Sequence, residues 1–169
     1  MEASLVILPA IALGASLLTL ISGFGLGTLL LPVFALFFPL EIAILLTAIV
    51  HLLNNLFKLG LLAKDIHWPT VLCFGVPGIA SAGLGAWLMR ALGAREALFQ
   101  GLLHPVDPLD IVIAALMLVF GIIELSKKLN ALSLPREWMV PGGLISGFFG
   151  GLSGDQGALR SMFLLRSGP

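Results

Sequence analysis

The placement of charge constrains this chain more than any other feature of its sequence. Asp, Glu, Lys and Arg are absent from residues 3–40, 42–57, 66–89, 111–123 and 138–154. About 20 consecutive apolar residues cross the hydrocarbon core of a bilayer as a helix. We therefore predict several membrane-spanning helices.

Composition supports the same fold class. The chain has 169 residues, of which 59% are hydrophobic and 11% are charged. In soluble domains roughly a quarter of the residues carry charge. A soluble chain this short could not bury apolar helices on all sides. The predicted fold is an all-α membrane protein, a polytopic helical bundle with helices broken at glycines.

Several classes of function lack support in the sequence. The formal net charge of 0 gives no electrostatic basis for binding nucleic acid. The single cysteine, Cys73, cannot form a disulfide within the chain. His67 and His104 lie in predicted loops, without Cys or carboxylate at ligand spacing, so we expect no metal site. No nucleophile–base pair is apparent, and we predict neither an enzyme nor a cofactor.

The first apolar stretch, residues 3–40, is too long for one straight helix. We predict a helix to about Ile21, an unwound segment at 22–27, and a second helical piece to about Phe38. Whether this stretch crosses the membrane once or twice stays open.

The remaining helices are predicted from the charge-free stretches and the turn residues between them. They cover residues 42–62, 68–92 and 109–125, with a turn at 64–65, a loop at 93–108 and a last apolar segment from Trp138. Trp68 is expected to lie at the membrane interface.

One pentapeptide, Leu-Ile-Ser-Gly-Phe, occurs twice, at residues 20–24 and 144–148, and each copy leads into further glycines. We expect each copy to open a Gly-rich break in a membrane span. Duplicated halves with helices broken at corresponding positions are typical of secondary transporters. We therefore expect a first repeat unit at 1–130 and the start of a second at 139–169. The second unit would be incomplete, so we expect either a fragment of a longer protein, which we favour, or a natural half-unit that pairs with another.

A polar stripe follows one face of the predicted helix 42–62. It consists of Thr47, His51, Asn54, Asn55 and Lys58, which share a face at 3.6 residues per turn. Such groups are costly in lipid, so the stripe is expected to line a polar pathway. Alternatively, the two Asn residues only link helices and Lys58 extends to the interface. His51 is the residue of the stripe that can exchange a proton near neutral pH.

The second Gly-rich segment, residues 153–157, carries polar side chains and precedes a helix that includes Arg160. The start of such a helix offers free N–H groups and the positive end of its dipole to an anion. Arg160 would add a fork of donors suited to oxyanions. Alternatively, Asp155 only caps the helix and pairs with Arg160. The first segment, 22–28, offers the same geometry without charge, or serves close helix packing.

These patterns give the candidate substrate-binding residues. They are Ser22, Gly23, Gly25, Gly27, His51, Asn54, Asn55, Lys58, Ser153, Gly154, Asp155, Gln156, Gly157 and Arg160.

Several of these segments together resemble a known family. They are residues 22–27 followed by Pro32, the turn 64–68, the small-residue segment 83–88 and the Gly-rich stretch 143–154. In these features, which extend over essentially the whole chain, the protein resembles the TauE/SafE family of sulfite exporters and sulfonate-permease-like proteins. It departs from the family pattern at Asp155 and Gln156, where further glycine is usual.

The resemblance implies a secondary transporter that moves a small anion across the bacterial plasma membrane. The substrate would be a sulfur-containing oxyanion or an organosulfonate, and the partners are the lipid bilayer and this anion, without nucleic acid. A homo-oligomer is compatible with the sequence. The alternative is a non-transporting membrane scaffold or assembly subunit, in which the polar stripe binds another protein.

Overall fold

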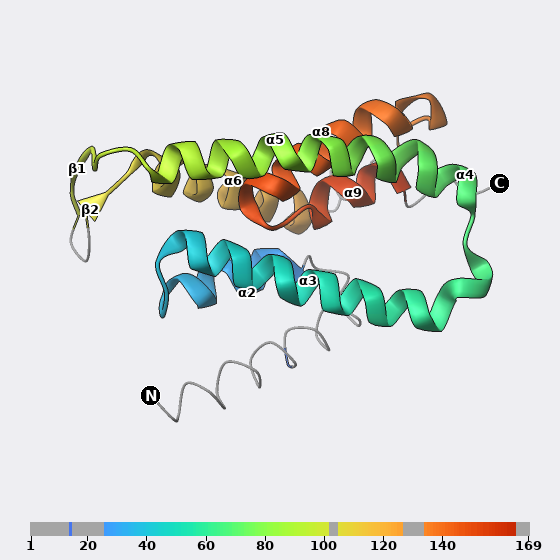
Figure 1. Ribbon diagram of the computed structural model, residues 1–169, viewed down its shortest axis with the longest axis horizontal. Helices are drawn as coiled ribbons and strands as arrows, with labels where there is room; N and C mark the ends of the chain where they lie inside the picture. Colours follow the sequence, from blue (N-terminus) through green and yellow to red (C-terminus); the bar gives the residue numbers. More distant parts are fainter. Residues whose placement is uncertain (1–13, 15–25, 102–104, 127–133, 165–169) are drawn as a thin grey trace.

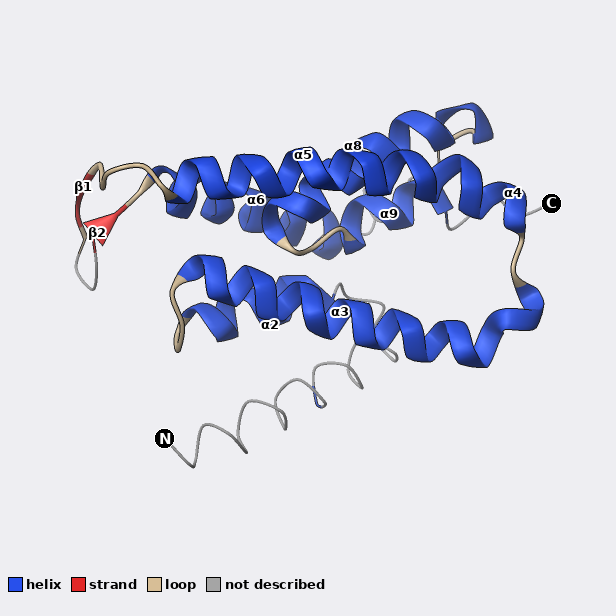
Figure 2. Ribbon diagram, in the orientation of Figure 1, coloured by secondary structure: helices blue, strands red, loops and turns tan. Residues whose placement is uncertain are grey.

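A computed structural model of the protein describes residues 14, 26–101, 105–126 and 134–164. In this part of the chain, helices run along the long axis of the molecule and one small hairpin lies at an end (Figures 1 and 2). In order, the elements are α2 Leu26–Ala35, α3 Leu40–Leu62, a 3-10 turn Ala63–Asp65, α4 Trp68–Thr70, a π-helical segment Val71–Gly75, α5 Val76–Gly93, β1 Phe99–Gln100, β2 Pro105–Val106, α6 Pro108–Leu125, a 3-10 turn Arg136–Trp138, α8 Met139–Ser153 and α9 Gly157–Leu164.

The prediction of an all-α membrane protein is confirmed. Within the described residues, three helical stretches are long and apolar enough to cross a membrane: Leu40–Leu61, Trp68–Gly93 and Pro108–Leu125. These correspond to the three helices predicted at 42–62, 68–92 and 109–125. The predicted turn at 64–65 is present as the 3-10 turn Ala63–Asp65.

Local chemistry explains where these helices begin and change. The side chain of His67 accepts a hydrogen bond from the N–H of Thr70 at the start of α4. The π-helical segment Val71–Gly75 lies just before Pro77, which has no N–H to donate to the preceding turn. Asp107 and Asp110 form a capping box at the start of α6, each side chain accepting from the other's N–H.

The prediction was wrong for one loop and for the end of one helix. The predicted loop 93–108 contains the antiparallel pair β1–β2, in which Phe99 faces Val106. The helical piece predicted to reach Phe38 ends at Ala35, because the chain turns before Pro39, whose ring disfavours helix in the preceding residue.

The first predicted break, 22–27, was wrong at its last two residues. Leu26 and Gly27 are helical and lie in α2, whereas Ser22, Gly23 and Gly25 lie outside the described residues. The position of a break before Leu26 therefore stays a prediction.

The second break was predicted to open at the pentapeptide, and this was also wrong. Residues 144–148 are helical within α8, and the chain leaves the helix only at 154–156. Gly154 adopts φ 73°, a left-handed conformation that glycine accepts without strain and that ends α8. The segment equivalent to this break in the first copy, 30–32, is helical in α2. The break is thus not duplicated there, and the repeat units 1–130 and 139–169 stay a prediction.

The glycines of α8 instead allow close packing against the helix that contains α5. A Cβ atom on Gly143, Gly147 or Gly151 would collide with the backbone carbonyl of Phe74, Gly78 or Ala82 respectively. These glycines recur every four residues, so they form one face along which two backbones touch. This contact fixes α8 against the spanning helix and holds its end, at Ser153, inside the molecule.

The α5–α8 contact gives a matched pair of substitutions on α5. In Gly85→Ala, the added methyl group would meet the carbonyl oxygen of Phe148, whereas Gly83 has no heavy atom within 4 Å of the position of its Cβ. We expect Gly85→Ala to destabilise the fold by about 1–3 kcal/mol through overpacking. Gly83→Ala should be neutral or slightly stabilising, because alanine favours helix. Thermal unfolding in detergent would measure both, and equal midpoints would contradict the packing described.

Candidate functional site

The chain break at residues 154–156 lies directly against the beginning of α2. A Cβ atom on Gly27 would collide with the side chain of Asp155, and the hydroxyl of Thr28 is 2.9 Å from Asp155 Oδ2. Since α9 begins at Gly157, the two short helices α2 and α9 start at nearly the same place inside the molecule.

From this common point α2 and α9 run toward opposite ends of the bundle. The end of α2 leads into α3, whose Glu41 lies against Gly93 at the end of α5. Near the end of α9, the ring of Phe163 packs on that of Phe74, close to the beginning of the same spanning helix. The arrangement therefore resembles two half-helices that meet inside the bundle from its two ends.

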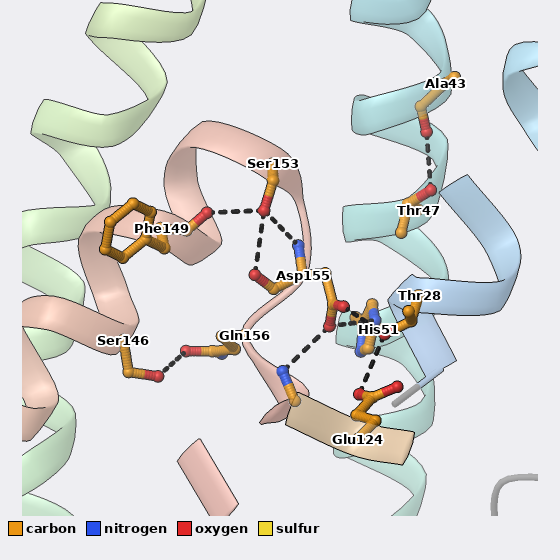
Figure 3. A network of polar contacts seen from close by, with 11 residues as sticks. Thr28, Ala43, Thr47, His51, Glu124, Ser146, Phe149, Ser153, Asp155 and Gln156 are labelled. Carbon is orange, nitrogen blue, oxygen red and sulfur yellow. Dashed lines mark hydrogen bonds and ion pairs between the residues drawn. The ribbon is translucent and has the colours of Figure 1, made fainter. Parts of the chain in front are cut away.

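Asp155 is the centre of the polar cluster at this meeting point (Figure 3), and it is 0% exposed. Its Oδ1 accepts a hydrogen bond of 3.0 Å from the N–H of Gly157, and its Oδ2 accepts from Thr28. The hydroxyl of Ser153 accepts from the N–H of Asp155 at 3.4 Å and lies 2.8 Å from the carbonyl oxygen of Phe149. The carboxylate is thus held by one backbone N–H group and one side-chain hydroxyl group.

His51 approaches Asp155 from the middle of the 23-residue helix α3. Its Nε2 is 3.8 Å from Asp155 Oδ1, and the side chain is 17% exposed. This separation exceeds the range of a hydrogen bond. Nε2 has no hydrogen-bond partner among the described residues. Asp155, Arg160 and Lys58 all act electrostatically on His51.

Glu124, near the end of α6, reaches the same cluster from a third side. It is 8% exposed, and its Oε1 is 3.0 Å from the hydroxyl of Thr28. Thr28 therefore lies between the carboxyl groups of Glu124 and Asp155 (Figure 3). A carboxyl group buried this deeply among apolar helices is costly and is a mark of function.

Seven of the eleven predicted site residues that the structure describes come together here. The cluster contains Gly27, His51, Ser153, Gly154, Asp155, Gln156 and Gly157. Gln156 accepts a hydrogen bond of 3.3 Å from the hydroxyl of Ser146. Arg160 is half-buried in the first turn of α9 and acts electrostatically on Asp155.

The remaining predicted residues are separate from the cluster or outside the described part. Asn54, Asn55 and Lys58 are half-buried further along α3, and no hydrogen bond between described residues joins them to the cluster. The start of α9 was predicted to offer free N–H groups. The first of these groups, on Gly157, is not free, because it donates a hydrogen bond to Asp155.

The sequence did not single out Thr28, Glu124 or Ser146 as site residues. For Glu124 a signal was available, since it is a carboxyl group that directly follows the charge-free stretch 111–123 in a predicted span. Thr28 is the last residue of the predicted segment 22–28, but neither it nor Ser146 carries a signal of its own, because hydroxyl groups in apolar helices commonly bond to their own backbone.

Apolar spanning helices around a buried polar cluster, at a break between half-helices, define a polytopic membrane transporter. Comparison with protein families matches residues 8–168 to the family described as sulfite exporter TauE/SafE. The chain belongs to this family, whose members are membrane transporters and not enzymes, and membership implies transport of sulfite or related anions. Neither the curated proteins nor the solved structures yield a match to the chain.

The bridging position of Thr28 predicts a stability difference between two substitutions. Thr28→Val keeps the shape but removes the hydroxyl from both carboxyl groups, so we expect a loss of about 1–3 kcal/mol. Thr28→Ser keeps the hydroxyl and should retain most of this stability. Thermal unfolding in detergent would compare the two, and a valine variant as stable as the serine variant would contradict the bridge.

Proposed function

We propose that this protein is a secondary transporter of the bacterial plasma membrane that carries a small sulfur-containing oxyanion or organosulfonate. Its substrate site is formed by residues 153–157 and the start of α2. The observation that carries the proposal is the meeting of α2 and α9 at one buried polar cluster, in a chain of the sulfite exporter TauE/SafE family.

The geometry of the two half-helices favours an anion. Each helix start bears the positive end of a helix dipole, and here two such ends converge from opposite sides. Discontinuous helices with their starts directed at an anionic group are a recurrent design of secondary transporters. Because Asp155 already binds the N–H of Gly157, the substrate uses donors beyond that first group.

Charged and amide side chains supply those donors. Arg160 lies one turn into α9, and Lys58 extends the positive charge along α3; both act on His51. The planar guanidinium of Arg160 offers paired N–H donors that match the oxygens of a sulfite or sulfonate group. The amide nitrogen of Gln156 adds a further donor, while its oxygen accepts from Ser146.

Charge pairing keeps the empty site stable. Asp155 balances Arg160 when no substrate is present, which lowers the cost of a buried cation. An entering oxyanion competes with Asp155 for Arg160 and for the protonated form of His51. Binding therefore depends on how strongly Asp155 is held by Thr28 and Gly157.

Flux measurements with a matched pair of arginine substitutions test the proposal. The full-length protein in vesicles is given sulfite or isethionate, and uptake is compared for wild type, Arg160→Gln and Arg95→Gln. Loss of a charged hydrogen bond at the site should lower uptake by roughly tenfold to a hundredfold in Arg160→Gln. Arg95→Gln, which alters an exposed arginine between α5 and β1, should transport like the wild type.

Two results would contradict the proposal. Equal uptake by Arg160→Gln and wild type would show that Arg160 does not bind the substrate. Absence of uptake by the wild type, together with copurification of a fixed partner protein, would favour the scaffold function instead.

A further inference from the structure

We propose that Ser146 on α8 is a positioning residue for the substrate. Together with Gly150, it holds the side-chain amide of Gln156 with the oxygen turned toward α8, so that the amide nitrogen is the group left to donate to an anion. The orientation of Gln156 concerns the chain alone. Its consequence for anion binding rests on the proposed transport function.

The hydroxyl of Ser146 behaves differently from the other buried hydroxyls of the described helices. Those of Thr47, Ser81 and Ser153 each donate to a backbone carbonyl oxygen three or four residues earlier, as is usual in helices. Ser146 is 0% exposed, and among the described residues its proton is accepted by the side-chain oxygen of Gln156, at 3.3 Å. The bond is long, but a buried hydroxyl proton left without an acceptor would be costly.

The single proton of Ser146 decides which end of the amide faces α8. In the reverse orientation the amide nitrogen would donate to the hydroxyl oxygen, and the hydroxyl proton would then have no acceptor among the described residues. The oxygen of Gln156 therefore faces Ser146, and the two N–H bonds of the amide point elsewhere.

Gly150, one turn after Ser146 on α8, makes room for this amide. A Cβ atom on Gly150 would lie 3.2 Å from the Cβ of Gln156 and 3.4 Å from both its Cδ and its side-chain oxygen. The side chain of Gln156 thus lies against α8 at Gly150, and its oxygen reaches Ser146 from there (Figure 3). Two successive turns of α8 therefore hold one amide group.

The fixed amide lies one turn from the arginine of the proposed site. Gln156 directly precedes α9, and its backbone carbonyl accepts a hydrogen bond of 2.8 Å from the N–H of Arg160. Both residues are half-buried, and the amide nitrogen of Gln156 makes no hydrogen bond to a described residue. A glutamine free to turn would also present its oxygen, which repels an anion. Holding the oxygen on Ser146 removes this alternative before the anion arrives, so less ordering is needed on binding.

Nuclear magnetic resonance of the purified protein, labelled with isotopic nitrogen in glutamine, tests the orientation without a ligand. The sequence contains two glutamines, Gln156 and the exposed Gln100 of β1, which is an internal reference. We expect the amide signals of Gln156 to report a rigid group in wild type and in Ser81→Ala, and a group as mobile as that of Gln100 in Ser146→Ala. Ser81→Ala is the matched control, because it removes a buried hydroxyl that bonds to its own helix.

Two spectroscopic results would overturn the orientation. One is a wild-type Gln156 amide as mobile as that of Gln100. The other is a Gln156 amide that stays rigid in Ser146→Ala. The signals are assigned with Gln156→Leu, which lacks one of the two pairs.

Uptake of isethionate into vesicles tests the consequence for binding. Ser146→Ala should raise the half-saturating concentration by roughly threefold to tenfold, because the donor to the anion is no longer held in place. Ser81→Ala should match the wild type. Since Ser146 acts through Gln156, Ser146→Ala should have no further effect when Gln156 is replaced by leucine.

Two uptake results would overturn the positioning role. They are a half-saturating concentration that Ser146→Ala leaves unchanged, and an equal effect of Ser146→Ala with and without Gln156. If the wild type takes up neither isethionate nor sulfite, the proposed transport is overturned, and the role of Ser146 in binding with it. The resonance measurement still decides the orientation of Gln156 in that case.

Discussion

A carboxylate enclosed by apolar spanning helices is stable only if several donors surround it, and at Asp155 these donors come from separate parts of the chain. Thr28 contributes from α2, Gly157 from α9, and His51 approaches from the middle of α3. No single helix supplies all of these donors. Asp155 therefore links the break at 154–156 to α2 and α3. The position of α9, and of any substrate beside it, depends on this interaction.

Glycine performs two different tasks around this carboxylate. Gly143, Gly147 and Gly151 bring the backbone of α8 against the spanning helix that contains α5, which fixes the depth at which α8 ends. Gly154 then turns the chain with a left-handed conformation, and Gly27 leaves the space on α2 that the side chain of Asp155 occupies. Close packing thus places the break, and the break places the carboxylate.

Physical limits explain which features the sequence could predict. Charge-free stretches and Pro or Asp at their borders sufficed for α3, α6 and the spanning helix that starts at Trp68. Glycine itself does not reveal whether it breaks a helix or packs it, so the break assigned to 144–148 was misplaced. The buried position of Glu124 depends on α2, which is distant in sequence. The polar stripe of α3 was visible as a pattern, but only His51 approaches the cluster, since Asn54, Asn55 and Lys58 lie further along the helix.

The central claim is that a sulfur oxyanion binds where α2 and α9 meet, and protection of an introduced cysteine from labelling measures this most directly. The natural Cys73 is first replaced by serine, and Gln156→Cys or the exposed control Arg95→Cys is added. Labelling by a water-soluble thiol reagent is then followed with and without sulfate or isethionate, neither of which reacts with the reagent. We predict that at least one of these anions slows labelling at position 156 and leaves position 95 unchanged. Equal labelling rates at position 156 with and without both anions would contradict the claim.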